Sequence, residues 1–504
     1  MQLPIAPLSR IFSIFTTDAF GIPTEPEPWG INAVAKALSP LLSGNAIIHL
    51  PCSESWHALQ VRASSPHVQP NFGMVVEVAT EEDVQATVQT ANRFNVPFLA
   101  VTGTHGWTTT LNNLPYGIQI RMRKLNVTTI DDGGQTATVG GGTLQHEITT
   151  ALFAQKKQAV TGLCQCVSVA GPLLAGGHSA LQARHGYAVD NIVSARIVLA
   201  DGSVVTVSET ENADLFWAIR GAGHNFGIVT RMTLRIYDIK KTWTVYTLIF
   251  TIDKIESLFK LVNKFDADPK RPSSMFLFGV GVRILDVDKS KPVIAYNVVF
   301  EGSEDEAYEW VQPFIVVGPA STQIAKNVDY EFLHTIIGED LNSPACRTGM
   351  NIIGGTASIP KWNVTSLTIA FDIFSDMIAD PRYSTSIFLL ENYGIQGVQA
   401  VDPDSMSLSL EERKYPVLAS PAIWWEGNRS EDAKNAIEYG DRMRQALFDG
   451  DNENTRRHTY VNYAKGDEPV EQMYGYEDWK IRKLVHLKKV YDPENRFRFY
   501  NPLV

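Results

Sequence analysis

The sequence predicts an α+β protein in which a strand-rich first domain is followed by a second domain with an antiparallel sheet covered by helices. The length supports more than one domain, because 504 residues exceed the roughly 100–200 residues of a typical domain. Residues 74–101 follow the order strand, helix, strand, which indicates parallel pairing. Beyond residue 240, long strands with period-2 alternation lie between helices, which is typical of an antiparallel sheet with one covered face.

The first domain opens on this strand–helix–strand unit. Met74–Val78 is an apolar run typical of a buried strand, Thr80 and Asp83 form a capping box that starts a helix, and Phe98–Val101 is the next strand. Asp201-Gly202 is a turn signal between two later strands, which predicts a hairpin. The pattern predicts further strands at Ile118–Met122, Ala137–Val139, Ala195–Leu199, Val204–Val207 and Ile228–Ile236, and helices at Leu144–Gln155 and Ala213–Ile219.

The second domain is expected to combine helices with long strands. The predicted helices are Ile255–Phe265, Glu304–Phe314 and Ala433–Leu447, and the predicted strands are Ser274–Ile284, Pro292–Phe300, Ser366–Phe374 and Ser384–Leu390. A last helix, with Trp479, Leu484, Leu487 and Val490 at helical spacing, is expected to return to the first domain. The chain therefore divides into an N-terminal arm (residues 1–70), a first domain (71–238), a second domain (239–464) and a returning segment (465–504).

Composition argues against several classes of protein. The net charge is −11, which argues against a nucleic-acid-binding protein because such a protein needs a basic face. No apolar run reaches the roughly 18–20 residues that cross a bilayer, so we expect no membrane partner. Met1–Pro23 has neither a basic start nor a long apolar stretch, so it is not a complete signal peptide.

The cysteines are Cys52, Cys164, Cys166 and Cys346, and four in a chain of 504 are too few for a disulfide scaffold. The pair Cys164-x-Cys166 lacks the further ligands that a metal site needs, so we expect no bound metal.

Glycines gather at four places in the first domain, and there they indicate a phosphate-containing ligand. Turns rich in glycine leave backbone N–H groups free to hold an anion, although each cluster alone would equally suit a tight turn. Neither a P-loop nor a complete dinucleotide-binding turn is present. The clusters are Gly103 with Gly106, Gly140–Gly142, Gly171–Gly177 and Gly221–Gly227.

His105 lies between these glycines in a loop that follows a predicted strand. A single histidine is usually a packed or solvent-facing residue, but one flanked by glycine at the end of a strand is well placed to meet a ligand. A neutral imidazole in that position can act as a nucleophile.

Longer motifs resemble one family. Residues 162–171 and 176–191, with the sequences GLCQCVSVAG and GGHSALQARHGYAVDN, resemble the berberine bridge enzyme-like FAD-linked oxidases of the vanillyl-alcohol oxidase / p-cresol methylhydroxylase (PCMH) superfamily. Residues 214–229, 460–463 and 487–497 are similar to the later signatures of the family, in the same order. The resemblance runs from about residue 70 to residue 504.

This resemblance implies a PCMH-type FAD-binding domain built from both ends of the chain, and a substrate domain whose sheet lies over the flavin. It implies a covalent bond from His105 to the flavin 8α carbon, and a second bond from Cys164, rather than Cys166, to flavin C6. A thiolate is the nucleophile needed, and nearby N–H groups would favour it; otherwise Cys164 is a small buried residue. Further FAD contacts are implied for Thr102, Gly103, Thr104, Gly106, Gly171, Gly176, Gly177, Asn191, Gly227, Val229 and Asn462.

The substrate half departs from the family pattern. Oxidation of an alcohol needs a base for the hydroxyl proton. The stretch from Tyr393 to Asp404 is expected to be the strand that carries it, with Gln396, Val398 and Ala400 on one face. This register puts Ala400 at the position of the base, so the usual carboxylate is expected to be missing.

Other residues are candidates for the missing role. His185 replaces a tyrosine that acts in the site of some plant relatives, and it is either a base or a histidine packed under the flavin loop. Tyr460 and Tyr463 are further candidates for contacts with substrate or proton. Pro172 stands where some relatives carry a flavin-bonding histidine, so that contact is lost, and His178 occupies a normally apolar position.

The resemblance favours an oxidase that transfers hydride from a CH–OH or CH–NH group to flavin N5 and reduces O₂ to hydrogen peroxide. Two covalent bonds usually accompany open sites, which suits an oligosaccharide or an aromatic secondary metabolite as the small-molecule substrate. The alternatives are a dehydrogenase that uses another acceptor, with oxygen access controlled near Val169 and Ala170, and a flavin-binding protein with lost chemistry. The family resemblance also favours secretion, and the sequence marks no oligomeric interface.

Overall fold

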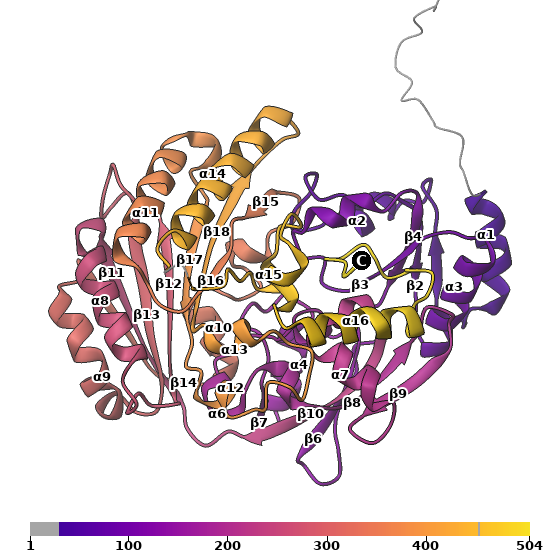
Figure 1. Cartoon of the computed structure of the whole chain (residues 1–504), viewed down its shortest axis with the longest axis horizontal. Coiled ribbons are helices and arrows are strands. Elements are labelled where there is room, and N and C mark those ends of the chain that lie inside the picture. Colours follow the sequence, from indigo (N-terminus) through magenta and orange to yellow (C-terminus); the bar gives the residue numbers. More distant parts are fainter. Residues whose placement is uncertain (1–29, 452–453) are drawn as a thin grey trace, which may run out of the picture.

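The structure is a computed structural model that describes residues 30–451 and 454–504. The segment Met1–Pro23, tested above for a signal peptide, lies outside the described residues. Three sheets form the framework, and they follow one another along the chain (Figure 1). Among the described residues, no helix is long and apolar enough to cross a membrane.

The first sheet has the strand order β1-β2-β4-β3, with β2 and β3 both parallel to β4. The capping box is confirmed, because Thr80 Oγ1 accepts from the N–H of Asp83 and the Asp83 carboxylate accepts from the N–H of Thr80. The elements are α1 (Ile31–Leu38), β1 (Ile47–His49), α2 (Trp56–Gln60), β2 (Phe72–Glu77), α3 (Glu81–Arg93), β3 (Phe98–Val101) and β4 (Gly117–Arg121).

The second sheet is antiparallel throughout. The hairpin predicted at Asp201-Gly202 is confirmed, and Gly202 has φ +83°, a left-handed conformation that suits glycine. The strands are β5 (Thr128–Ile130), β6 (Thr136–Gly140), β7 (Lys157–Ala159), β8 (Ile192–Val198), β9 (Val204–Ser208) and β10 (Ile228–Asp238). The helices are α4 (Gln145–Phe153), α5 (Ala170–Leu173), α6 (Gln182–His185) and α7 (Ala213–Ala222).

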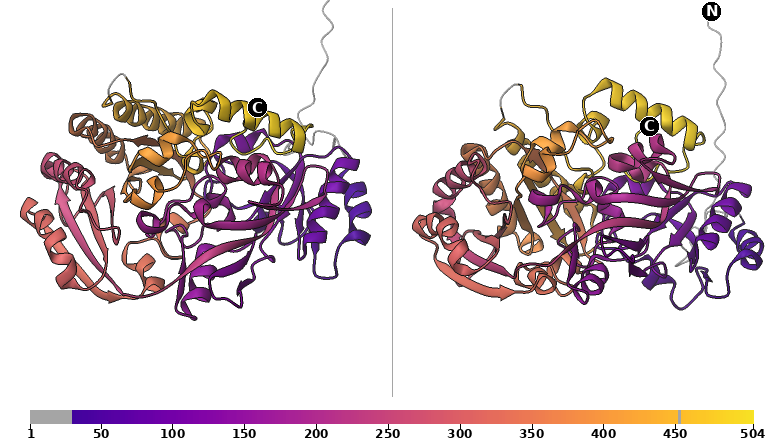
Figure 2. Two further views of the ribbon diagram at one scale, coloured as in Figure 1. Left: turned by 60° about the horizontal axis from the view of Figure 1, so that its bottom comes forward. Right: turned by 90° about the horizontal axis from the view of Figure 1, so that it is seen from below.

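The third sheet begins directly after β10 and is also antiparallel. Its strands are β11 (Trp243–Thr251), β12 (Met275–Val282), β13 (Val293–Glu301), β14 (Ser321–Val328), β15 (Asn351–Gly354), β16 (Ala357–Ile359), β17 (Ile387–Asn392) and β18 (Val417–Trp425). One face packs under the long helices α8 (Ile255–Asp266), α9 (Glu304–Val317), α11 (Val364–Ala379) and α14 (Ser430–Phe448), as Figure 2 shows from two sides. The other face packs against the second sheet and its helices.

The strand predicted at Ser366–Phe374 is wrong, because these residues lie in helix α11. The apolar residues that the helix buries recur at helical spacing, which the β-branched and aromatic composition concealed. The Asn363 side chain caps the helix by accepting from the N–H of Ser366. The buried positions are Leu367, Ala370, Phe371, Phe374, Met377 and Ile378.

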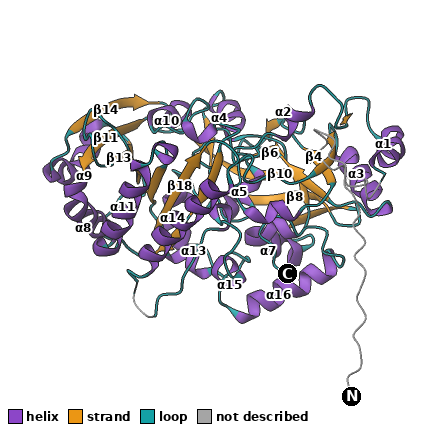
Figure 3. Ribbon diagram, turned by 90° about the horizontal axis from the view of Figure 1, so that it is seen from above, coloured by secondary structure: helices purple, strands orange, loops and turns teal. Residues whose placement is uncertain are grey.

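The end of the chain returns to the first two sheets. Helix α16 (Asp478–Tyr491) lies beside α7 (Figure 3), and Leu484 and Leu487 are buried there, whereas Trp479 and Val490 remain exposed. The last residues continue to the loop after β3, where Thr108 donates to the side chain of Asn501. The remaining helices are α10 (Tyr330–Ile336), α12 (Gln396–Gln399), α13 (Leu410–Lys414) and α15 (Val470–Tyr474).

Candidate active site

A large cavity lies between the first two sheets and the inner face of the third. One wall comes from the loop after β3, residues 162–172 and the start of β10. The facing wall comes from β12, β17, β18 and the segment 460–463. The cavity therefore collects side chains from both ends and the middle of the chain.

The loop after β3 is held tightly against the segment 166–168. A Cβ atom on Gly103 would lie 2.8 Å from the backbone nitrogen of Ser168, so only glycine fits there. Trp107 anchors the end of the loop by donating its Nε1–H to the carbonyl of Tyr463 over 3.0 Å. The backbone of residues 102–106 consequently lines the cavity.

His105 reaches into the cavity with one ring nitrogen engaged. Its Nε2 lies 2.9 Å from the carbonyl oxygen of Ala345. A carbonyl can only accept, so Nε2 carries the hydrogen and Nδ1 keeps a free lone pair. Burial lowers the pKa of His105 and outweighs the hydrogen bond to Ala345, and the charge of Arg62 lowers it further, so the ring is neutral. A neutral ring with a free Nδ1 is suited to nucleophilic attack.

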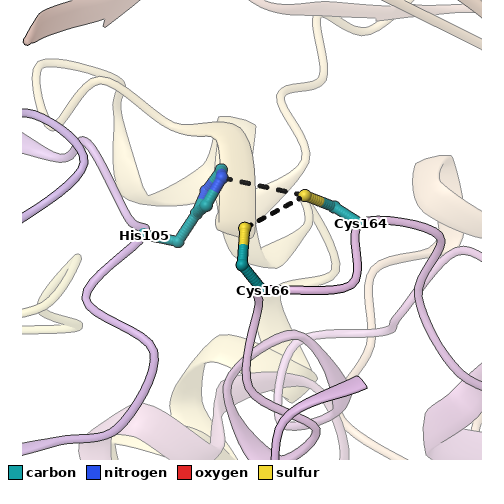
Figure 4. Close-up of side chains that lie close together, drawn as sticks. All are labelled: His105, Cys164 and Cys166. Carbon is teal, nitrogen blue, oxygen red and sulfur yellow. Dashed lines mark hydrogen bonds between the residues drawn. The ribbon is translucent and has the colours of Figure 1, made fainter. Parts of the chain in front are cut away.

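Cys164 lies next to His105 on the same wall. Its Sγ is 4.0 Å from Nε2 of His105, and the two side chains point toward one another in Figure 4. Cys166 forms a disulfide with Cys346, so Cys164 is the free thiol at this wall. His105, Cys164 and Cys166 also lie close enough to suggest a metal site, but the sulfur of Cys166 is already bonded.

The expectation that backbone N–H groups lower the pKa of the Cys164 thiol holds for one contact, but that contact does not decide the pKa. A hydrogen bond from the backbone of Cys166 acts in that direction. Burial and the neighbouring Glu339 carboxylate outweigh it and raise the pKa of Cys164 well above its usual range. The thiol is therefore protonated in this structure.

A carboxylate lies on the facing wall, at a position that sequence reasoning missed. Glu391 is at the end of β17, and the alternation of the strand turns Leu389 and Glu391 into the cavity while Leu390 packs under the helices. Its Oε2 accepts from Tyr393 OH at 2.5 Å, and its Oε1 accepts from Tyr463 OH at 3.1 Å. Burial raises the pKa of Glu391 despite these two hydrogen bonds.

The prediction that Ala400 stands at the position of the base is wrong. Strand β17 ends at Asn392, and residues 396–399 form the short helix α12, so alternation does not continue to Ala400. Gln396 and Ala400 are exposed, and Gln396 donates to the carbonyl of Arg271 outside the cavity. A lone glutamate directly after the apolar run 387–390 was the signal that could have revealed Glu391.

Two family models match the chain. The "FAD binding domain" model matches residues 72–208, and the "Berberine and berberine like" model matches residues 459–503. The FAD-linked oxidoreductase chyH of Penicillium rubens is 36% identical over 481 residues, which cover 94% of this chain and 94% of that protein. The chain belongs to the berberine bridge enzyme-like FAD-linked oxidoreductases. Its cofactor is FAD.

Solved structures show the same fold in other members of the superfamily. Xylooligosaccharide oxidase from Myceliophthora thermophila superposes with a TM-score of 0.79 at 21% identity, covering 94% of this chain and 99% of that one. Glucooligosaccharide oxidase from Acremonium strictum gives 0.77 at 21% identity with the same coverage, and its FAD is 6-S-cysteinyl, 8α-N1-histidyl. These likenesses establish that this berberine bridge enzyme-like chain has the PCMH-type fold.

The residues of the cavity fit FAD. The backbone of residues 102–106 forms a wall without bulky side chains, and His105 and Cys164 present a free imidazole nitrogen and a free thiol side by side. His224 adds a buried Nε2 for which the described residues supply no hydrogen-bond partner. Of the residues predicted to contact FAD, these line the cavity: Thr102, Gly103, Thr104, His105, Gly106, Cys164, Gly171, Gly227, Val229 and Asn462.

Three other predicted FAD contacts support the wall from behind. Gly176 and Gly177 lie behind Tyr460, whose hydroxyl accepts from the N–H of Gly177 at 3.0 Å and from Asn462 at 2.7 Å. Asn191 donates to the carbonyl of His185, so it fixes the bend after α6 and does not line the cavity.

Of the four candidates for catalysis, Tyr460 and Tyr463 line the cavity, and Gln396 and His185 do not. His185 stacks on Tyr237 with ring centroids 3.6 Å apart. Burial, together with the charge of Arg184, lowers the pKa of His185 to about 4. Of the two alternatives for His185, a base or a packed histidine, the structure therefore agrees with the packed histidine.

His178 has a defined polar environment in place of the apolar one that is usual at its position. Its Nε2 lies 2.7 Å from Glu412, whose other oxygen lies 2.6 Å from Nε2 of His458. Burial opposes ionisation of Glu412, but the hydrogen bonds from both histidines outweigh it and lower the pKa of Glu412 to about 2. At Pro172, the backbone carbonyl accepts from the side chain of Asn462 at 2.9 Å.

Proposed function

We propose that the protein is an oxidase that holds FAD through two covalent bonds, to His105 and Cys164, and oxidises a CH–OH or CH–NH group of a small-molecule substrate. The flavin supplies the hydride acceptor at N5, and dioxygen then takes the electrons and becomes hydrogen peroxide. The observation that carries the proposal is the placement of His105 and Cys164 on one wall and Glu391 on the facing wall of a single cavity.

Glu391 is the residue that takes the substrate proton in this proposal. Both hydroxyl groups that touch it, from Tyr393 and Tyr463, can donate to it, so the carboxylate is held in one orientation. Its raised pKa makes it a stronger base than an exposed glutamate. With Glu391 in the cavity, the missing carboxylate no longer supports the hypothesis of lost chemistry.

The lining of the substrate side favours an aromatic secondary metabolite over an oligosaccharide. The residues around Glu391 are mainly apolar or aromatic, whereas a sugar needs many hydrogen-bonding partners. This part of the wall consists of Phe278, Ile352, Ile387, Leu389, Tyr393 and Trp424. An oligosaccharide remains the alternative, because structural neighbours of the same fold are named for such substrates.

Two features support dioxygen as the acceptor and secretion as the location. Ala170 is a small residue on the cavity wall, and Val169 is buried behind it, so no bulky side chain at these positions blocks access to the flavin. A dehydrogenase would need such a block.

The disulfide between Cys166 and Cys346 is typical of proteins from oxidising compartments, which agrees with secretion.

Anaerobic reduction of the purified yellow protein tests this function. We expect benzylic or allylic aromatic alcohols to bleach the flavin faster than cello- or xylo-oligosaccharides, and air to restore the colour with one peroxide per turnover. A protein that is bleached by an alcohol but not reoxidised by air would be a dehydrogenase. A flavin that no member of either panel reduces would contradict the oxidoreductase chemistry proposed here.

A further inference from the structure

The segment 337–347, between α10 and β15, covers the two residues proposed to bond the flavin. Its Ala345 carbonyl accepts from His105, and its Cys346 is bonded to Cys166. The carbonyl of Glu339 accepts from the N–H of Gln165 at 2.9 Å. The segment is thus attached to the two residues that follow Cys164 in the sequence.

The Glu339 side chain reaches the thiol of Cys164. It lines the cavity beside this cysteine, and the two side chains share a hydrogen bond, in which the protonated thiol donates and the carboxylate accepts. Burial and the nearby charge of Glu391 raise the pKa of Glu339 to about 8, and the contact with Cys164 opposes this only in part. Glu339 therefore places a carboxyl group of raised pKa beside the sulfur, and its ionised form is a stronger base than an exposed glutamate.

Among the residues that the structure describes, the other polar groups near Cys164 already have hydrogen-bond partners of their own. His105 Nε2, at 4.0 Å, already donates to Ala345. Glu391 uses its two oxygens for the hydroxyl groups of Tyr393 and Tyr463. Asp340 is a second carboxylate on the segment, and its Oδ1 accepts from the N–H of Asn342.

We propose that Glu339 is the base that removes the thiol proton of Cys164 when this cysteine bonds to the flavin, and that the Cys166–Cys346 disulfide holds Glu339 in place for that step. The inference rests on the two-bond attachment proposed above. It explains how a thiol whose surroundings disfavour the thiolate can still react.

The step balances as follows. The S–H bond breaks, its proton moves to the Glu339 carboxylate, and the sulfur forms a bond to flavin C6. The hydrogen on C6 leaves as a proton. The electron pair of the C6–H bond stays in the ring, which is thereby reduced by two electrons. Dioxygen then takes two electrons and two protons to become hydrogen peroxide, and the ring is oxidised again with its sulfur attached.

The test uses a His105→Ala background, in which Cys164 is the one remaining point of attachment. The holoprotein is precipitated with acid, and the flavin in the pellet and in the Cys164 peptide is measured by absorbance and mass. We expect His105→Ala to keep its flavin and His105→Ala/Glu339→Gln to lose at least nine-tenths of it. Asp340→Asn in the same background is the matched control, because an asparagine oxygen can still accept from Asn342, and we expect full retention.

A second measurement separates a proton-transfer role from a structural one. His105→Ala/Glu339→Asp keeps a carboxylate and should recover attachment, and raising the pH to 10 should slowly restore it in the Gln variant, because hydroxide then supplies the thiolate. Equal retention in His105→Ala and His105→Ala/Glu339→Gln would overturn the proposal. If His105→Ala itself loses all flavin to the supernatant while wild type does not, the proposed second bond is absent, which is a failure of the function rather than of Glu339.

Discussion

Tyr463 OH lies 3.1 Å from Oε1 of Glu391, so the segment 460–463 and strand β17 meet at one carboxylate although 72 residues separate them. Tyr463 also receives the indole N–H of Trp107 on its carbonyl oxygen. The proposed base on one wall of the cavity is thereby connected to the loop that carries His105 on the other wall. The same short segment therefore contacts both the proposed proton acceptor and the loop that is proposed to bond the flavin.

The first prediction concerns Glu391 as the base. We expect Glu391→Gln to slow anaerobic flavin reduction by about 10²–10⁴-fold, because general-base assistance is worth that much. Tyr463→Phe keeps the carboxylate and loses one donor, so its rate should fall much less. In wild type, the reduction rate should decrease as the pH drops through the raised pKa of Glu391, and the Gln variant should lack this dependence. A normal rate in the Gln variant would contradict the assignment.

The second prediction concerns the number of bonds to FAD. After acid precipitation, His105→Ala and Cys164→Ala should each retain flavin in the pellet, and the double variant should release all of it. Cys52→Ala is the control, since Cys52 is an exposed free cysteine that does not line the cavity. Release of flavin from either single variant would show that the other residue makes no bond.

The third prediction concerns the disulfide. Cys164 Sγ lies 3.7 Å from Cys346 Sγ, so Cys166→Ser should leave Cys346 free to pair with Cys164 under oxidising conditions. Non-reducing peptide mapping should then find a Cys164–Cys346 peptide and little flavin on Cys164. The double variant Cys166→Ser/Cys346→Ser, which cannot form this pair, should recover part of the attachment. Absence of the new pair in the single variant would contradict the prediction.

The fourth prediction concerns stability. The pKa of Glu412 falls from 4.5 to about 2 on folding, and a depressed carboxyl pKa stabilises the folded state above the unfolded-state value. This contribution, about 3 kcal/mol at 1.36 kcal/mol per pKa unit, should be lost as the pH falls from about 4.5 toward 2. Urea unfolding at pH 7 and pH 3 should show a smaller pH effect for Glu412→Gln than for wild type. Glu256→Gln, at an exposed site on α8, should behave like wild type in both conditions.

The fold was largely predictable from local pattern. The capping box at Thr80, the hairpin at Gly202 and three of the eight strands of the third sheet (β12, β13 and β17) follow from rules that act within a few residues. Helix α11 was misassigned because its β-branched and aromatic residues suit a strand as well, and only packing against α8 and α14 decides between the two.

The candidate site was predictable where backbone motifs form it and unpredictable where tertiary packing does. His105 and Cys164 could be found from their glycine-rich surroundings and from family resemblance. Glu391 was missed because alternation was continued past Asn392, where the strand ends. Glu339 and Cys346 were missed because they reach the site from a loop more than 170 residues from Cys164. A sequence pattern within a few residues cannot indicate such a contact.

The contacts at the end of the chain have a consequence for biosynthesis. Tyr500 lines the cavity and packs against Gly106, and Asn501 receives the hydroxyl of Thr108 just after the His105 loop. A nascent chain that has not yet reached residue 501 lacks these contacts, so this wall of the pocket forms late in synthesis. Folding of the first sheet alone therefore leaves the site beside His105 incomplete.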